Sequence, residues 1–147
     1  MTKLILLITL VWLFSCVQEN QNQNQPITPQ PEYTSEDAGE WEAIKQDHLP
    51  FTDVNLKEKS IFVKVESKTF NETHYIEKIG IMNQDKVDLA VKSFNRTDKT
   101  EVAFQFKTFP EDWKHTKIYV KCNLHDLWTT TLEEEIAKTR AREREKR

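Results

Sequence analysis

The sequence predicts an all-β domain, an antiparallel β-sandwich with a short helix at its C-terminal end. Short segments of alternating apolar residues recur between residues 61 and 122, and turn-prone stretches at 82–85, 95–99 and 110–113 separate them. The chain has only two glycines, and no long helical pattern lies between the segments. Strands at this spacing favour a sandwich over an α/β fold.

Five segments have the composition and the period of β-strands. They are residues 61–67, 73–82, 87–94, 100–106 and 117–122. Because side chains alternate between the two faces of a strand, residues two apart share a face. The expected shared faces are Ile61, Val63 and Val65; Val87, Leu89 and Val91; Val102, Phe104 and Phe106; and Ile118, Val120 and Cys122.

The segments on either side of these strands have helical character. Residues 34–47 are acidic and weakly helical, with an interruption at Gly39. Residues 131–147 predict a helix capped by Thr130 or Thr131, with acids in its first turn and bases in its last turn, which suits the helix dipole. Its apolar face is nearly absent, which indicates a solvated helix that frays. A surface-binding role for its basic end is the alternative.

The N-terminal region predicts export and attachment to a membrane. An apolar run at 4–14 is too short for a typical membrane span of roughly 20 residues and indicates a signal peptide at 1–15. The run ends in LFSC, which resembles a bacterial lipobox, so Cys16 is the expected site of lipidation. An ordinary secretory signal and a single-pass anchor are the alternatives. The expected location is extracytoplasmic, on a bacterial membrane.

The remaining chain divides into a tether, one domain and the helix. The Gln, Asn and Pro residues that follow Cys16 cannot form a core, so residues 16–33 predict a flexible tether. Residues 34–130 are long enough for one small domain, and 131–147 form the helix. The formal net charge is −3, with charges of both signs mixed along the chain, which argues against a nucleic-acid partner.

Cys122 has no intramolecular partner if Cys16 carries lipid, because the chain has two cysteines. This excludes a disulfide framework and leaves a buried thiol, an intermolecular disulfide or a metal ligand. His125 follows three residues later, and a thiolate and an imidazole at this spacing can bind the same ion. A metal site still needs further ligands from elsewhere in the chain.

The run VKCNLHDLW (120–128) closely resembles a C-terminal signature of the superoxide reductase (desulfoferrodoxin, neelaredoxin) family. Residues 72–81, ETHYIEKIGI, and 47–51, DHLPF, resemble two further segments of that family, and 100–106 is similar more loosely. The matches occur in the family's order over about residues 40–128.

The resemblance implies a seven-stranded immunoglobulin-like sandwich that holds one mononuclear iron. It implies that Cys122 is an axial ligand and that His48, His74 and His125 are equatorial ligands. The implied reaction is the one-electron reduction of superoxide to hydrogen peroxide, with electrons from a donor that the sequence does not identify.

The chain departs from the family pattern at one ligand. Where the family has an H-P-M triplet, this chain reads Lys68-Thr69-Phe70, so a fourth imidazole is missing. Lysine is a poor replacement because its ammonium group, with an ordinary pKa of about 10.4, must lose a proton before it can bind a metal. Just before the first histidine, Gln46 and Asp47 replace the family's acid and lysine.

Two hypotheses follow from this departure. In the first, iron binds through the four remaining ligands, and Lys68 attracts the superoxide anion. In the second, the chain is a non-catalytic lipoprotein whose sandwich has a binding or structural role. Zinc is a further possible occupant, since three imidazoles and a thiolate suit that ion. His115 lies seven residues before Cys122, about 20 Å away along an extended strand, and is expected at the surface.

Overall fold

The computed structural model describes residues 31–96, 99–107, 109–125 and 127–146. The predicted signal peptide, Cys16 and nearly all of the predicted tether therefore lie outside the described residues. No helix in these ranges is long and apolar enough to cross a membrane.

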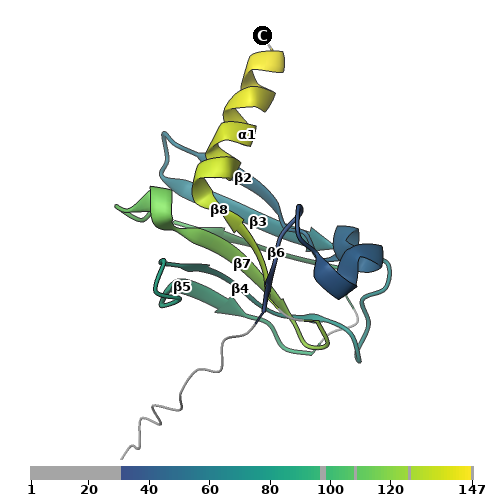
Figure 1. Cartoon of the computed structure of the whole chain (residues 1–147). Coiled ribbons are helices and arrows are strands. Elements are labelled where there is room, and N and C mark those ends of the chain that lie inside the picture. The colour runs from purple at the N-terminus through teal and green to yellow at the C-terminus, as the bar shows by residue number, and fades with distance from the viewer. Residues whose placement is uncertain (1–30, 97–98, 108, 126, 147) are drawn as a thin grey trace, which may run out of the picture.

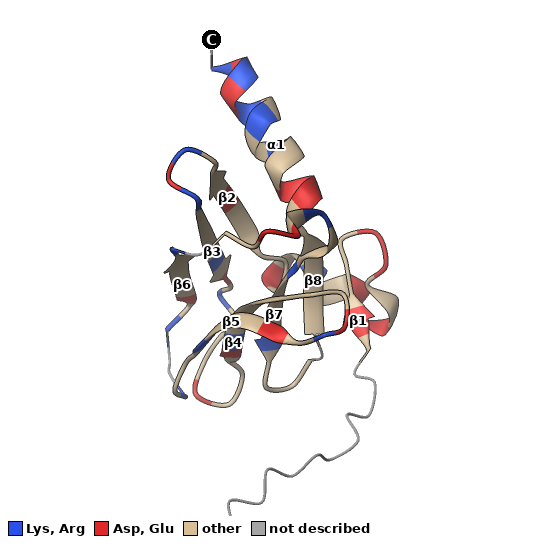
Figure 2. Cartoon of the chain, turned by 90° about the vertical axis from the view of Figure 1, so that its left-hand side faces the viewer, with Lys and Arg blue, Asp and Glu red and all other residues tan. Residues whose placement is uncertain are grey.

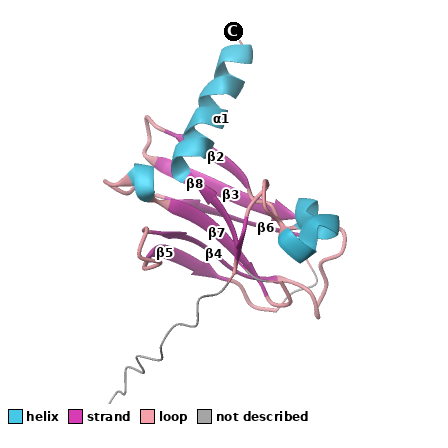
Figure 3. Ribbon diagram, viewed as in Figure 1, coloured by secondary structure: helices cyan, strands magenta, loops and turns pink. Residues whose placement is uncertain are grey.

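The domain is a sandwich of two antiparallel sheets with an immunoglobulin-like architecture (Figure 1, Figure 3). The elements in chain order are β1 (Glu32–Tyr33), the 3-10 helix η1 (Gly39–Asp47), β2 (Phe51–Asn55), β3 (Ser60–Glu66), β4 (Ile76–Met82), β5 (Asp88–Ser93), β6 (Glu101–Phe106), the 3-10 helix η2 (Trp113–His115), β7 (Lys117–Cys122), β8 (Leu127–Thr131) and α1 (Leu132–Glu145). One sheet has the order β1-β8-β7-β4-β5, and the other has the order β2-β3-β6. Among the strands of the described residues, β1 alone runs parallel to its neighbour, which is β8.

The core lies between the two sheets and consists of the alternating residues that the sequence indicated. Ile61, Val63 and Val65 on β3 are almost fully buried, as are Ile118 and Val120 on β7. Burial of a valine or isoleucine side chain contributes about 1.5–3 kcal/mol, so this alternation fixes which face of each strand is turned inward.

The expectation for β5 was wrong in one respect. Val87, Leu89 and Val91 are exposed, whereas Ala90 and Phe94, which directly follows the strand, pack against the core. Strand β5 is the edge of its sheet, and its register with β4 shifts between Ile81 and Met82. Every residue of β5 except Ala90 is exposed, so apolar residues on this strand do not mark a buried face.

The C-terminal helix is also different from the solvated helix that we expected. Thr131 caps it through a capping box with Glu134, as predicted, and Figure 2 shows acidic residues at its start and basic residues towards its end. Its first half, however, packs on the domain: Ile136 is buried, and Thr139 Oγ1 accepts a hydrogen bond from the Val54 N–H. The Arg142 guanidinium donates to the Thr52 carbonyl at 2.7 Å.

The N-terminal boundary of the domain lies slightly earlier than the tether prediction implied. Glu32 and Tyr33 form β1, and Glu32 makes ion pairs with Lys86 and Lys117. The Tyr33 ring packs on Trp128, with ring centroids 5.6 Å apart. The last two residues of the expected tether range are therefore part of the fold.

Candidate metal centre

Three imidazoles and one thiol come together at one end of the sandwich. The potential ligand atoms of His48, His74, Cys122 and His125 all lie within 4.8 Å of one another. Nε2 of His48 is 3.1 Å from Nε2 of His74 and 2.8 Å from Nδ1 of His125. Two nitrogens bound to one ion at about 2 Å each are about 3 Å apart at ordinary coordination angles, so this spacing suits a shared cation.

The end of η1 holds His48. The backbone N–H of His48 donates to the Lys45 carbonyl, and its side-chain Nδ1 lies 3.1 Å from the carbonyl oxygen of Ile44. Since a carbonyl oxygen only accepts, Nδ1 carries the proton, and Nε2 keeps its lone pair for a metal. This residue is fully buried. Burial lowers the pKa of His48 to about 4, which keeps the imidazole neutral near pH 7.

The segment that carries His74 is fixed by backbone contacts just before β4. His74 and Asn71 form an isolated antiparallel bridge, and Asn71 Oδ1 also accepts from the Thr73 N–H at 2.8 Å. From the other side, the Asn123 amide donates to the Thr73 carbonyl at 2.9 Å and accepts from the Tyr75 N–H at 2.7 Å. Asn123, which directly follows Cys122, therefore connects the chain around His74 to the end of β7.

Cys122 ends β7, and the loop to β8 brings His125 back towards it. The sulfur lies 3.8 Å from Nδ1 of His125. Burial raises the pKa of the Cys122 thiol, while the backbone N–H groups of Leu124, His125 and Asn123 act in the opposite direction. N–H groups directed at a sulfur stabilise its thiolate, which is the form that binds a metal.

Aromatic rings surround the three imidazoles. Trp41 packs on His125 with ring centroids 4.6 Å apart, and Trp128 stacks on His48 at 5.5 Å. Phe70 meets both His48 and His74. An apolar shell of this kind excludes water and strengthens electrostatic interactions at the site.

The remaining residues singled out in the sequence lie apart from this cluster. Lys68 is exposed in the turn after β3, and it makes no hydrogen bond or ion pair with the four residues in the part of the chain that the structure describes. His115 is exposed, as expected, and its Nδ1 lies 2.8 Å from Asp112 Oδ1. Sequence reasoning did not identify Phe70 or Asn123. Asn123 could have been noticed from its place inside the CNLH run.

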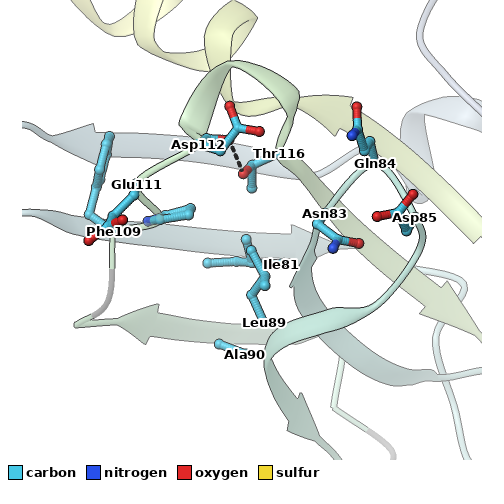
Figure 4. A pocket seen from close by; sticks show the side chains of 11 residues that line it. Ile81, Asn83, Gln84, Asp85, Leu89, Ala90, Phe109, Glu111, Asp112 and Thr116 are labelled. Atoms are coloured by element: carbon cyan, nitrogen blue, oxygen red, sulfur yellow. Dashed lines mark hydrogen bonds between the residues drawn. The ribbon is translucent and has the colours of Figure 1, made fainter.

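A separate cavity of about 610 Å³ lies at the opposite end of β4 (Figure 4). Ile81 and Leu89 contribute to its apolar lining, and the carboxylates of Asp85 and Glu111 also line it. On β4, Ile81 pairs with Ile118, whereas Ile76 pairs with Cys122, so the length of the strand separates this cavity from the metal-ligand cluster.

The donor set suits a transition metal. Imidazole nitrogens and a thiolate bind iron or zinc, and nothing in the set favours magnesium or calcium, which prefer oxygen. Three histidines and a cysteine at one end of an immunoglobulin-like sandwich therefore form a group that could hold such an ion.

Comparison with protein families then assigns the chain. Residues 40–131 match the desulfoferrodoxin family model, and the chain belongs to this family. Comparison with curated proteins gives no match.

Solved structures with a similar fold include several superoxide reductases. The enzyme from Treponema pallidum is 23% identical, with 60% of this chain and 69% of that chain covered and a TM-score of 0.42. The superoxide reductase (neelaredoxin) from Ignicoccus hospitalis is 23% identical, with 67% and 89% covered and a TM-score of 0.46. The superoxide reductase from Nanoarchaeum equitans is 17% identical, with 58% and 90% covered and a TM-score of 0.37.

Proposed function

We propose that this chain binds one iron ion through His48, His74, His125 and Cys122 and reduces superoxide to hydrogen peroxide. The observation that carries the proposal is the convergence of these four donors within 4.8 Å, in a chain of the desulfoferrodoxin family. Iron, when bound, supplies one-electron redox chemistry. The overall reaction consumes one superoxide, one electron from an external one-electron donor and two protons for each hydrogen peroxide.

The chain's own residues have three roles in this proposal. The Ile44 carbonyl orients the His48 ring. The N–H groups of the loop after Cys122 would stabilise a metal-bound thiolate against the burial that favours the thiol. Access from solvent is on the side of His125, which is only partly buried and follows the exposed Leu124. The exposed ammonium of Lys68 would draw the superoxide anion towards the site, against the repulsion of Asp47.

Metal analysis and spectroscopy test the binding step. Protein loaded with ferrous iron under anaerobic conditions and then oxidised should contain one iron per chain and show a visible thiolate-to-iron charge-transfer band. The Cys122→Ser variant should lose this band, because the band needs the sulfur ligand. His115→Ala removes the exposed histidine outside the cluster and should keep the band. A wild-type protein without iron or band after loading would contradict the proposal.

Stopped-flow decay of superoxide tests the reaction. Iron-loaded protein should accelerate the decay, and Lys68→Glu should reduce the second-order rate constant more at low salt than at high salt, because screening weakens steering. A protein that binds iron and leaves the uncatalysed decay unchanged would instead be a non-catalytic metal-binding member of the family. Elemental analysis of protein expressed without added metal distinguishes iron from zinc.

We further propose that the mature protein is a lipoprotein anchored through Cys16 to a bacterial membrane and exposed outside the cytoplasm. The support is the apolar run at 4–14 followed by LFSC. Metabolic labelling with a radioactive fatty acid should label the wild type and not Cys16→Ser. If the wild-type protein is unlabelled and recovered without its first residues, an ordinary secretory signal is the better explanation.

A further inference from the structure

The position of Phe70 has a consequence for the metal centre proposed above. The centroids of the three candidate ligand rings are 5.2 Å apart for His48 and His74, 4.6 Å for His48 and His125, and 4.8 Å for His74 and His125. Phe70 lies at nearly the same separation from two of them, 5.7 Å from His48 and 5.1 Å from His74. Its ring therefore contacts both His48 and His74, as the His125 ring does at the shorter separations of 4.6 and 4.8 Å.

The local chain structure explains why Phe70, and not Lys68, faces the cluster. The Ser67 hydroxyl accepts a hydrogen bond from the Thr69 N–H at 3.0 Å, which closes a turn after β3. Lys68 and Thr69 are exposed in this turn, whereas Phe70 follows it and is only 4% exposed. The bridge between Asn71 and His74 then holds the backbone next to Phe70 close to that of His74.

The apolar ring of Phe70 occupies space beside His48 and His74 that a ligand nitrogen could otherwise occupy. Its ring is edge-on to both imidazoles, with interplanar angles of 73° and 90°, and it is part of the hydrophobic core. A buried phenyl ring offers no lone pair, and a close-packed side chain leaves no room for water.

We propose that Phe70 sets the number of protein ligands at four and that position 70 is a latent position for a fifth ligand. This inference rests on the proposed metal site and does not require superoxide reductase activity. An imidazole at position 70 would lie about as far from the rings of His48 and His74 as the existing ligand rings lie from one another. Phe70→His should therefore convert a four-donor site into a five-donor site.

Cobalt(II) is the probe, because its visible absorption depends on its coordination number. Four-coordinate cobalt(II) without a centre of symmetry absorbs several times more strongly in its ligand-field bands than five- or six-coordinate cobalt(II). Wild-type protein with one cobalt per chain should show the strong bands, with a thiolate charge-transfer band that is absent in Cys122→Ser. In Phe70→His the ligand-field absorption should be several-fold weaker than in the wild type. This variant should also bind cobalt about tenfold more tightly.

Two variants control for effects unrelated to coordination. Phe70→Leu removes the ring without adding a donor and should keep the strong four-coordinate bands. Phe104→His adds a histidine in the three-stranded sheet, where the Phe104 ring packs on Phe106, and should leave the spectrum unchanged. Circular dichroism checks that each variant is folded.

A second approach applies if Phe70→His does not fold. In Phe70→Ala the space beside His48 and His74 is open, and free imidazole should lower the ligand-field intensity at concentrations about tenfold below those that the wild type requires. If Phe70→Ala and the wild type need the same concentration of imidazole, the inference is overturned.

The remaining outcomes separate this inference from the proposed function. Weak, high-coordinate bands in the wild type, or a Phe70→His spectrum identical to that of the wild type, would overturn the inference even if the iron protein removes superoxide. Strong bands that weaken in Phe70→His support the inference even if superoxide decay is not accelerated. A wild-type chain that binds no cobalt would overturn the inference.

Discussion

At the scale of single residues, the candidate metal centre is held in place by side chains outside the four candidate ligands. Asn123 is the clearest case, because its amide bonds to the backbone on both sides of His74, at Thr73 and Tyr75. Its own N–H also donates to the Tyr75 carbonyl at 3.1 Å. Groups that orient ligands in this way typically affect metal affinity by about 10- to 100-fold.

We expect Asn123→Ala to weaken metal binding by about tenfold, because the His74 segment loses two side-chain hydrogen bonds while all four ligands remain. Competition with a chelator measures the affinity. Asn83→Ala is the matched control: Asn83 Oδ1 accepts from the Val87 N–H at the far end of β4, so its loss should not change metal affinity. Equal affinities of Asn123→Ala and wild type would show that the backbone contacts, the bridge to Asn71 and the Asn123 N–H bond to Tyr75, are sufficient to fix His74.

The surroundings of Tyr119 indicate that alkaline pH lowers the stability of the fold. It packs over Gly80 on β4, where a Cβ would come within 2.4 Å of its ring, and its hydroxyl donates to Asp88 at 2.8 Å. Burial, followed by this hydrogen bond to a carboxylate, raises the pKa of Tyr119 well above its usual value. The fold therefore favours the neutral phenol.

The stability that the neutral Tyr119 phenol provides is complete below the ordinary tyrosine pKa of about 10 and is lost as the pH rises towards the raised value. The free energy of unfolding should therefore fall above about pH 10 in the wild type and fall less steeply in Tyr119→Phe. Urea unfolding at a series of pH values measures this. In spectrophotometric titration, the most alkaline tyrosine ionisation should disappear in Tyr119→Phe; its persistence would assign that step to another tyrosine.

At the scale of elements, helix α1 shows how a polar sequence can still pack. Its few apolar residues, Leu132 and Ile136, lie one turn apart and are buried, and Thr139 and Arg142 then bond to β2. The sequence indicated the cap and the charge order, because both are local properties. It did not indicate the packing, since that depends on where β2 lies.

The capping box at Thr131 should contribute measurably to stability. Its side chain accepts a hydrogen bond from the Glu134 N–H, and Glu134 bonds back to the Thr131 N–H. We expect Thr131→Ala to lower the free energy of unfolding by about 1 kcal/mol. Thr131→Ser keeps the hydroxyl and should lower the free energy of unfolding much less. Urea denaturation measures both. If the serine variant loses as much as the alanine variant, the threonine methyl group in β8 is more important than the cap.

At the scale of the whole molecule, the features that the sequence predicted are those that depend on residues close together in the chain. Alternation predicted the buried faces of β3 and β7. The resemblance to the desulfoferrodoxin family implied the four candidate ligands, and the structure brings these four residues together. Strand β1 has two residues and pairs only through β8, so no local pattern marks it. Sequence reasoning assigned no role to Phe70 beyond its place in the triplet that departs from the family pattern, because its position beside His48 and His74 exists only after the sheets have assembled.

The four candidate ligands also connect the two sheets, which predicts a coupling between metal binding and stability. His48 lies just before β2 of the three-stranded sheet, while Cys122 ends β7 and His74 precedes β4, both in the five-stranded sheet. A bound ion would join these segments, which are far apart in the unfolded chain. An ion that binds only the folded state, at about 100 times its Kd, stabilises that state by about 2.7 kcal/mol.

We therefore expect anaerobic addition of ferrous iron to raise the Tm of the wild type by several degrees and to raise that of Cys122→Ser much less. Differential scanning calorimetry measures the shift, and a chelator should reverse it. His115→Ala should respond to iron as the wild type does, because the exposed His115 lies outside the cluster. If iron binds tightly and leaves the Tm unchanged, the ion binds the unfolded chain equally well, and the geometry at the end of the sandwich does not provide the binding energy.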